Sequence, residues 1–245
     1  MLSVRRAALI GVLTLALGLL IVFPARIAYQ LFAPQTVKLA EISGSVWNGS
    51  AGEAAANGVY LRDLRWQIRP SQLLTGALAY TFTAKPSSGT VTANVSVGLA
   101  GGVTVTDLRA ALPLQTLRSV LKNPGLAGSL TVQLDELTAD STGPKTASGR
   151  FEIANLVDPR LHRESLGDYR ADISSDVSGI LVAIEDSDGD IDIDAQLRLA
   201  PDLSYQFVAL LAPKSSTPPN LRQFMQRLPF ADDGVNRIYQ FEGRM

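Results

Sequence analysis

Residues 190–199 read DIDIDAQLRL, a run in which polar and apolar side chains alternate from one end to the other. Successive side chains of a β-strand point to opposite faces of the sheet, so this run predicts a strand with one apolar face and one hydrated face. TVTANVSV at residues 90–97 and SLTVQLD at residues 129–135 alternate in the same way. Antiparallel sheets commonly bury one face and expose the other, so the chain is predicted to be mainly β.

Clusters of Gly, Pro, Asn and Asp separate these runs and predict a meander of strands joined by turns. The clusters lie at residues 85–89, 101–102, 123–125, 141–144 and 186–189. Asp188-Gly189 has the sequence of a type I′ turn, so we expect a tight hairpin between strands at residues 180–184 and 191–199. A calcium loop is the alternative for this acidic run, but its glycine comes fourth rather than sixth, and Leu197 stands where such a loop needs glutamate.

Two further stretches have the spacing of a short helix. Residues 113–121 and 220–228 each place apolar side chains three or four positions apart, as one face of a helix requires. The apolar sets are Leu114, Leu117, Val120 and Leu121 in the first stretch and Leu221, Phe224 and Leu228 in the second. Pro113 suits a first helical turn and Asn220 suits an N-cap, so we expect two short helices beside the strands.

An unbroken apolar run at residues 7–23 lies near the start of the chain, with Arg5 and Arg6 before it and Arg26 after it. Because only a helix satisfies its own backbone in lipid, the run predicts either a membrane helix or a signal peptide. A signal peptide has a shorter core and small residues at its cleavage site, where this chain has Arg26, so we favour an uncleaved anchor. The arginines before the run favour a cytoplasmic N-terminus.

These features divide the chain into a cytoplasmic tail at residues 1–6, a single transmembrane anchor at residues 7–26 and a periplasmic β-rich domain at residues 27–245. The side chains expected to contact lipid along the anchor include Ala7, Leu13, Leu17, Leu20 and Phe23.

A faint repeat is visible within the predicted domain. Residues 39–47 and 126–132 each open with Leu-Ala, followed by Gly-Ser and an apolar alternation. The pattern indicates either two copies of one β unit, at residues 39–120 and 126–245, or two strands that each begin at a glycine because each follows a turn.

The composition excludes several function classes. The formal net charge is −1, which provides no field for binding nucleic acid. The chain has no cysteine, which excludes disulfides, thiolate zinc sites and cysteine nucleophiles. An anchored domain without cysteine suits the bacterial periplasm.

His162 is the single histidine and the one candidate for acid–base chemistry. A metal site would need carboxylates such as Asp158 and Glu164, which follow no known ligand spacing. A serine hydrolase would need its nucleophilic serine exposed on a sharp turn, and the sequence has no Gly-x-Ser-x-Gly motif that would form such a turn. We interpret His162 as a loop side chain and expect no catalytic residue, no metal site and no cofactor.

Two blocks contain the two tryptophans, ISGSVWNGSA at residues 42–51 and LRWQIRPSQLLTG at residues 64–76. They resemble the opening signature and the next block of the type II secretion system protein N family, also called the general secretion pathway N family. Residues 221–243 are similar to the end of that family, and residues 85–215 match it in pattern only. The matching positions, for which we expect structural roles, are Gly44, Trp47, Gly49, Leu64, Trp66, Pro70, Leu74 and Gly76.

The resemblance implies a non-enzymatic inner-membrane accessory protein that supports export of folded proteins across the outer membrane. Its partners would be other inner-membrane and periplasmic subunits of the secretion machine. The family also looks like AsmA-type proteins, whose periplasmic parts are curved antiparallel sheets with an apolar inner face. That likeness implies a curved sheet here, and it supplies the alternative function, a periplasmic lipid- or hydrophobe-binding module.

Overall fold

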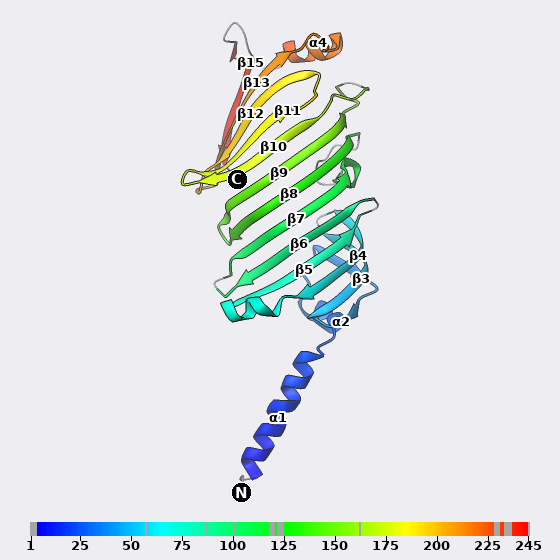
Figure 1. The fold of residues 1–245 in the computed structure, drawn as a ribbon, viewed down its shortest axis with the longest axis vertical. Coiled ribbons are helices and arrows are strands. Elements are labelled where there is room, and N and C mark those ends of the chain that lie inside the picture. The colour runs from blue at the N-terminus through cyan, green and yellow to red at the C-terminus, as the bar shows by residue number, and fades with distance from the viewer. Residues whose placement is uncertain are drawn as a thin grey trace.

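The computed structural model describes residues 4–56, 58–86, 88–99, 101–117, 121, 125–161, 163–227, 231–232 and 237–244. Within these residues, 15 strands form one antiparallel sheet in which almost every strand pairs with its neighbours in sequence (Figure 1). The order is β1-β3-β4-β5-β6-β7-β8-β9-β10-β11-β12-β13-β15-β14, with β2 paired to β3. This arrangement confirms the predicted β meander.

The strands are β1 Val37–Ala40, β2 Ser43–Gly44, β3 Asn48–Ala56, β4 Val59–Ile68, β5 Ala77–Lys85, β6 Thr90–Gly98, β7 Val103–Pro113, β8 Ala127–Asp140, β9 Gly143–Val157, β10 Tyr169–Asp176, β11 Gly179–Asp186, β12 Ile191–Leu199, β13 Ser204–Pro213, β14 Ala231–Asp232 and β15 Arg237–Arg244. The helical segments are α1 Val4–Ile21, α2 Ala25–Phe32, η1 Pro70–Thr75, η2 Leu114–Leu117 and α4 Pro219–Arg227. The alternating runs at residues 90–97, 129–135 and 190–199 are thus confirmed as parts of β6, β8 and β12.

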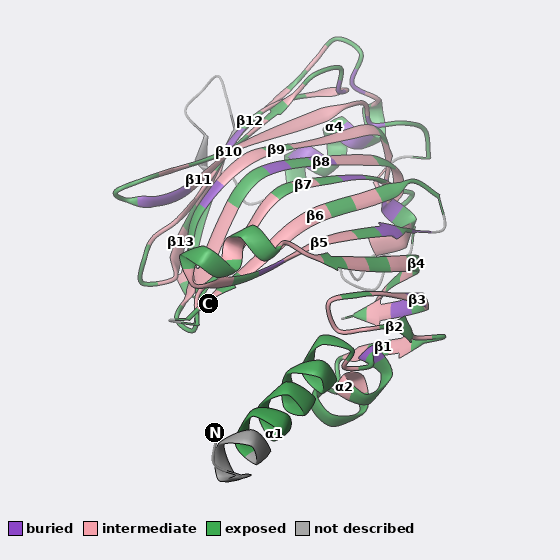
Figure 2. Ribbon diagram, turned by 60° about the horizontal axis from the view of Figure 1, so that its bottom comes forward, coloured by how far each residue is buried: buried purple, intermediate pink, exposed green. Residues whose placement is uncertain are grey.

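The strand register places apolar side chains on one face of the sheet and polar side chains on the other. Between β12 and β13, Leu197 lies opposite Phe207 on the first face, and Arg198 lies opposite Gln206 on the second. We call the first surface the apolar face; its members include Leu64, Trp66, Tyr80, Phe82, Val91, Val95, Leu108, Val132, Phe151, Ile173 and Val182. Figure 2 shows the strands arching, so the sheet is curved as expected.

Three of the hairpins turn through the same local motif, an aspartate followed two residues later by serine or threonine. The pairs are Asp140 with Thr142, Asp176 with Ser178 and Asp202 with Ser204. In each pair the hydroxyl and the backbone N–H both donate to one carboxylate oxygen, which closes the turn and holds the carboxyl pKa below its ordinary value.

The main core cluster is built on one face of the sheet rather than between two layers. Its members all lie on the apolar face of β6–β9: buried Ala110, Val132 and Leu134, with Val91, Leu108, Leu112, Leu130, Leu137 and Phe151 packed around them. The accessible surface is 15640 Å², whereas a compact protein of this mass would expose about 10,600 Å². The excess follows from a sheet that has no second layer over most of its described length, and from α1, which projects away from the sheet (Figure 1).

The apolar run near the start of the chain lies within α1 and the turn after it, and a second helix, α2, follows the run. α1 ends at Ile21, and Pro24 precedes α2, because proline disfavours helix in the residue before it and suits the start of a new one. The predicted anchor boundary at Arg26 therefore falls inside α2. None of the helices in the described part of the chain has both the length and the hydropathy that crossing a membrane requires.

The anchor positions fall on α1 and the turn after it. Leu13, Leu17 and Leu20 are exposed, and Phe23 is half-buried in the turn. The side chain of Ala7 lies outside the described part of the chain.

The predicted helix at residues 220–228 needs correction. α4 begins at Pro219, so Asn220 lies inside the helix and is not its N-cap. Leu221 and Met225 are the buried side chains of α4, whereas Phe224, which was expected on the packed face, is exposed. Asn220 instead uses its side-chain amide to donate to the backbone carbonyl of the loop after β9.

The predicted helix at residues 113–121 is shifted. Pro113 is the last residue of β7, and the helical turn η2 begins after it with buried Leu114. Residues 118–120, together with Leu228 of the second prediction, lie outside the described residues.

The predicted hairpin between residues 180–184 and 191–199 is confirmed, because β11 pairs with β12, but the predicted type I′ turn at Asp188-Gly189 is wrong. Glu185 pairs with Asp194, and β12 begins only at Ile191, so the connection is longer than a type I′ turn allows. The loop is instead tied to Asp168, whose carbonyl oxygen accepts hydrogen bonds from two residues of the loop. The predicted two-repeat organisation stays a prediction, although the sheet is continuous where the repeats would meet, since β7 pairs with β8.

Candidate functional site

The signature residues gather where α1 and α2 meet the first strands of the sheet. Residues 44–49, which we call the junction loop, run from β2 into β3 and include Gly44, Trp47 and Gly49. The other signature positions lie on β4 and around η1: Leu64, Trp66, Pro70, Leu74 and Gly76. The fold therefore brings the two tryptophan blocks together.

Trp47 joins the junction loop to the end of α1. Its indole Nε1 donates a hydrogen bond of 2.9 Å to the carbonyl oxygen of Leu20. The residue that would supply the α-helical N–H to this oxygen is Pro24, which has none. The backbone N–H of Val46 donates to the carbonyl oxygen of Phe23 at 3.0 Å. The helix end is thus held to the sheet by side-chain and backbone bonds.

Trp66 holds the junction loop from the side of the sheet. Its Nε1 donates to the carbonyl oxygen of Ser45 at 3.1 Å, and the N–H of Ile68 donates to the carbonyl oxygen of Trp47 at 2.7 Å. The Trp66 ring lies directly against Gly49, where an added Cβ would overlap ring atoms. Glycine at position 49 therefore allows the ring to lie across β3.

Two other signature glycines have left-handed backbone conformations. Gly44 has φ +84°, and an added Cβ would lie 2.5 Å from the carbonyl oxygen of Asn48. Gly76 has φ +76° and ends η1, with its N–H donating to the carbonyl oxygen of Leu73 at 3.2 Å. Glycine adopts this conformation without the penalty that a Cβ brings. These are contacts that a structural role would require, and the roles themselves stay predictions.

Leu74 differs from the other signature positions. It lies in η1, which begins at Pro70, and its side chain is 91% exposed. The neighbouring Leu73 is exposed as well. Packing within the described chain therefore does not account for a leucine at this position.

α2 lies over the first strands of the apolar face. Ala25 is buried, and the Tyr29 hydroxyl donates to the carbonyl oxygen of Val37 at 3.2 Å and accepts from the N–H of Leu39 at 3.1 Å. An apolar hollow of about 390 Å³ lies between α2 and the sheet, with aromatic lining from Phe32, Trp66, Tyr80 and Phe82. Burial raises the pKa of Tyr80, so its hydroxyl stays neutral in this surrounding.

At the other end of the sheet, a buried charge holds the long β11–β12 loop. The Asp186 carboxylate accepts hydrogen bonds from the Lys214 ammonium and from the N–H of Ile193, the latter at 3.0 Å. Burial raises the pKa of this carboxyl, but the Lys214 and backbone donors outweigh burial and hold it below its ordinary value. Burial, together with the charges of Asp186 and Asp190, raises the pKa of the adjacent Tyr169 to about 12.

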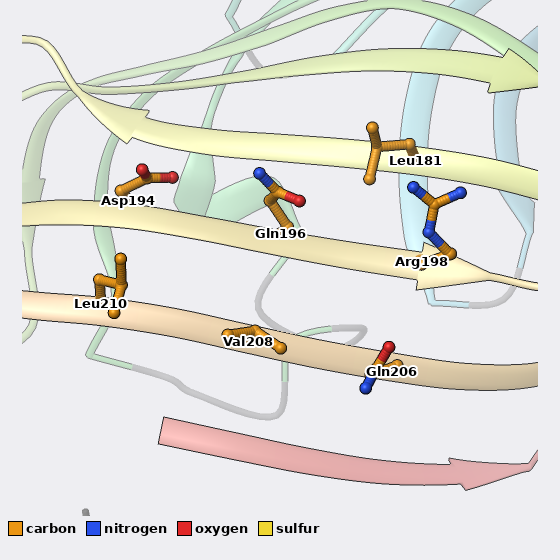
Figure 3. A pocket seen from close by; sticks show the side chains of 7 residues that line it. All are labelled: Leu181, Asp194, Gln196, Arg198, Gln206, Val208 and Leu210. Atoms are coloured by element: carbon orange, nitrogen blue, oxygen red, sulfur yellow. The ribbon is translucent and has the colours of Figure 1, made fainter. Parts of the chain in front are cut away.

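The polar face has a shallow hollow of about 250 Å³ over β11–β13 (Figure 3). Its lining is Leu181, Asp194, Gln196, Arg198, Gln206, Val208 and Leu210, spread along three strands. The Arg198 guanidinium bonds to the hydroxyl of Ser178 at 2.5 Å and lies 3.6 Å from the Asp176 carboxylate. Its charge is therefore used within the sheet, and the hollow does not bring together the nucleophile, base and oxyanion donors of a catalytic site.

His162 lies outside the described residues. The described part of the chain has no group of three or more His, Cys, Asp or Glu side chains placed to hold a metal ion. Asp158, considered above as a possible ligand, is buried and accepts two hydrogen bonds from the Arg160 guanidinium, at 3.2 and 3.0 Å.

Two residues of these clusters were missed from the sequence. The sequence predicted no role for Tyr29 or for Lys214. Tyr29 has no local signal, since its backbone partners Val37 and Leu39 lie 8 and 10 residues further along the chain. Lys214 has no local signal, since its partner Asp186 is 28 residues away.

Comparison with known proteins gives a match over most of the chain. A family model described as Type II secretion system (T2SS), protein N, matches residues 35–237, which include both tryptophan blocks. The chain belongs to the type II secretion system protein N family. A curated relative from Vibrio cholerae serotype O1, named Type II secretion system protein N, is 26% identical over 231 residues, covering 91% of each chain. No solved structure matches the chain.

Membership of the type II secretion system protein N family confirms the resemblance seen in residues 42–51 and 64–76. The match gives no support to the alternative of an AsmA-like lipid-binding module, which stays a prediction.

Proposed function

We propose that the chain is a non-enzymatic accessory component of the type II secretion system, anchored in the bacterial inner membrane by α1 with its sheet in the periplasm. The anchor confines the sheet to a plane and raises its effective concentration near other anchored subunits. The observation that carries the proposal is the junction in which Trp47 bonds to the end of α1, in a chain of this family.

The side chains of α1 support its role as the anchor. Leu13, Leu15 and Ile21 are all exposed, although at 3.6 residues per turn they point in different directions around the helix. A helix that is apolar all round is typical of a lipid environment. The exposed apolar Val22 extends the apolar run beyond the end of α1.

The polar face of the sheet supports contact with other proteins. It carries charged pairs across neighbouring strands, including Arg150 with Asp172 at 2.6 Å and Arg170 with Glu152 at 3.5 Å. Exposed pairs of this kind add little to stability, but a patterned charged surface selects partners and speeds their encounter. The edges of the sheet offer backbone donors and acceptors for a second type of contact.

The proposal is tested by releasing the sheet from the membrane without disturbing the junction. A cleavable signal peptide replaces residues 1–18, so the mature chain keeps the Leu20 carbonyl and the junction loop. We expect a folded periplasmic protein that supports secretion at least tenfold less well than the intact chain, because the gain in effective concentration is lost. Secretion of a type II cargo is measured in cells that lack the native gene.

An unrelated single transmembrane helix in place of residues 1–18 is the matched control, and it should restore secretion. Circular dichroism and thermal unfolding of the released form check that its sheet is intact. Full secretion by the folded, released form would contradict the proposal.

A further inference from the structure

Exposed apolar side chains surround the point where α1 leaves the sheet. Ile27 and Leu31 lie on the side of α2 opposite its buried Ala25, and Leu73 and Leu74 lie on η1. Leu99, beside the end of η1, is also exposed. In Figure 1, α2 and the helical turn before β5 lie at the end of the sheet from which α1 projects. We call Ile27, Leu31, Leu73, Leu74 and Leu99 the apolar rim.

The rim is unusual because its members share one end of the molecule. Single apolar side chains on a protein surface are common and need no explanation. A group of them around one helix end indicates a contact surface. The most exposed members are Leu99 at 94% and Leu74 at 91%, and Leu74 is also a signature position.

The distribution of charged residues along the chain indicates what kind of partner the apolar rim binds. Residues 25–106, which include the whole rim and lie after α1, carry six Lys and Arg but three Asp and Glu, whereas residues 107–245 carry 14 and 20. The stretches that contain the rim, residues 1–40 and 64–99, have no acidic residue. A basic surface with protruding leucines fits a layer of anionic headgroups over acyl chains.

We propose that the apolar rim docks the first strands of the sheet on the bilayer surface, with its leucines at the boundary between headgroups and acyl chains. Arg26, which lies on α2, and Arg69, which directly precedes η1, face the headgroups. This inference rests on the proposed anchoring by α1. Contact at both α1 and the rim fixes the height and tilt of the sheet above the membrane, which one helix alone would not do.

The absence of cysteine makes the test direct, because one introduced cysteine gives one labelling site. The full chain is reconstituted in vesicles of phosphatidylethanolamine and phosphatidylglycerol with an environment-sensitive fluorophore at Leu74→Cys. Nitroxide lipid reports proximity by quenching, with the nitroxide near the headgroup for positions 74 and 177 and on the acyl chain for position 13. Val177→Cys is the matched control, because Val177 is a fully exposed apolar residue at the tip of the β10–β11 hairpin, five strands along the sheet from β5. Leu13→Cys reports insertion of α1.

We expect quenching at positions 13 and 74 to exceed that at position 177 several-fold. Quenching at 13 with position 74 no higher than 177 would overturn the docking proposal and leave the anchor in place. A second result would also contradict docking: the fluorophore at position 74 is not quenched in vesicles and becomes shielded from water only when other secretion subunits are added. The rim would then bind protein rather than lipid. Weak quenching at 13 would overturn the anchor and this inference with it.

Discussion

The two ends of the sheet are held by different kinds of interaction. At the first end the interactions join neutral groups. The Trp47 and Trp66 indoles donate hydrogen bonds to backbone carbonyls, and Gly49 allows the Trp66 ring to lie against the strand. At the last end, the buried Asp186 carboxylate receives the Lys214 ammonium. Tyr205, Phe207 and Phe241 pack beside this end, with ring centroids 5.1 to 5.8 Å apart in the pairs with Phe241.

The difference follows from what each end must join. The first end connects a helix that is apolar all round to a sheet, and a buried charge next to that helix would be costly to desolvate. The last end closes a long loop between β11 and β12, where one carboxylate can accept several donors at once. The comparison predicts that the last end is sensitive to pH, whereas the first end is sensitive to side-chain volume.

The largest effect is expected from Asp186→Ala. The substitution leaves the Lys214 ammonium and the Ile193 N–H without their acceptor, and the Asp186 side chain is only 7% exposed. We expect the free energy of unfolding to fall by about 2–3 kcal/mol, less than for a fully buried pair, because Lys214 keeps some contact with water. Denaturant unfolding of the detergent-solubilised full chain measures the change.

The same site predicts a pH dependence. The pKa of Asp186 is lowered in the folded state, so its contribution is complete above the unfolded carboxyl pKa of about 3.9 and is lost as the pH falls through the folded value. In Asp186→Asn, the free energy of unfolding should depend less on pH below about pH 4 than it does in the intact chain. Asp63→Asn, which removes the exposed pair with Lys85, is the control and should change stability by less than about 0.5 kcal/mol. Equal pH profiles for the intact chain and Asp186→Asn would contradict the assignment.

A smaller effect is expected from Gly49→Ala at the first end. The added methyl group overlaps the Trp66 ring and approaches the Ser43 carbonyl oxygen, so strand and ring must separate. We expect a loss of about 2 kcal/mol, in the range for overpacking a tight contact. Gly98→Ala is the matched control, since the nearest atom to its added Cβ is 3.9 Å away. Similar losses for both variants would show that strand propensity rather than the ring contact sets the cost.

The smallest change in stability is expected from Trp47→Phe. This variant removes the Nε1 donor to Leu20 and keeps most of the ring, so about 1 kcal/mol should be lost. The clearer readout is geometric. Spin labels at Leu13→Cys and Lys85→Cys should give a broader distance distribution in Trp47→Phe than in the intact sequence. An unchanged distribution would mean that Trp47 does not fix the direction of α1.

The strands could be predicted from the sequence because their signal is local. Alternation over residues 190–199 depends only on the geometry of one strand, and β12 follows it closely. Both tryptophan blocks could also be recognised as a signature. Their meeting with α1 was not predicted, because the bond from Trp47 joins residues 27 positions apart.

The missed features have the same physical origin. Asp188-Gly189 resembled a tight turn, but the loop is held by Asp168 and Lys214 from other parts of the chain. Phe224 matched the helical spacing, yet Met225 is buried in its place, because the orientation of α4 is set by contacts outside the helix. The exposure of Leu74 could not be predicted either, since the sequence does not indicate which side of η1 packs against the rest of the chain.

A reporter at the far end of the chain tests the whole account most directly. Alkaline phosphatase, which is active only after export, is fused after Met245 of the full chain, and cells are fractionated after carbonate washing. The account predicts active enzyme that stays in the inner-membrane fraction. Inactive enzyme, or active enzyme released by the wash, would contradict it.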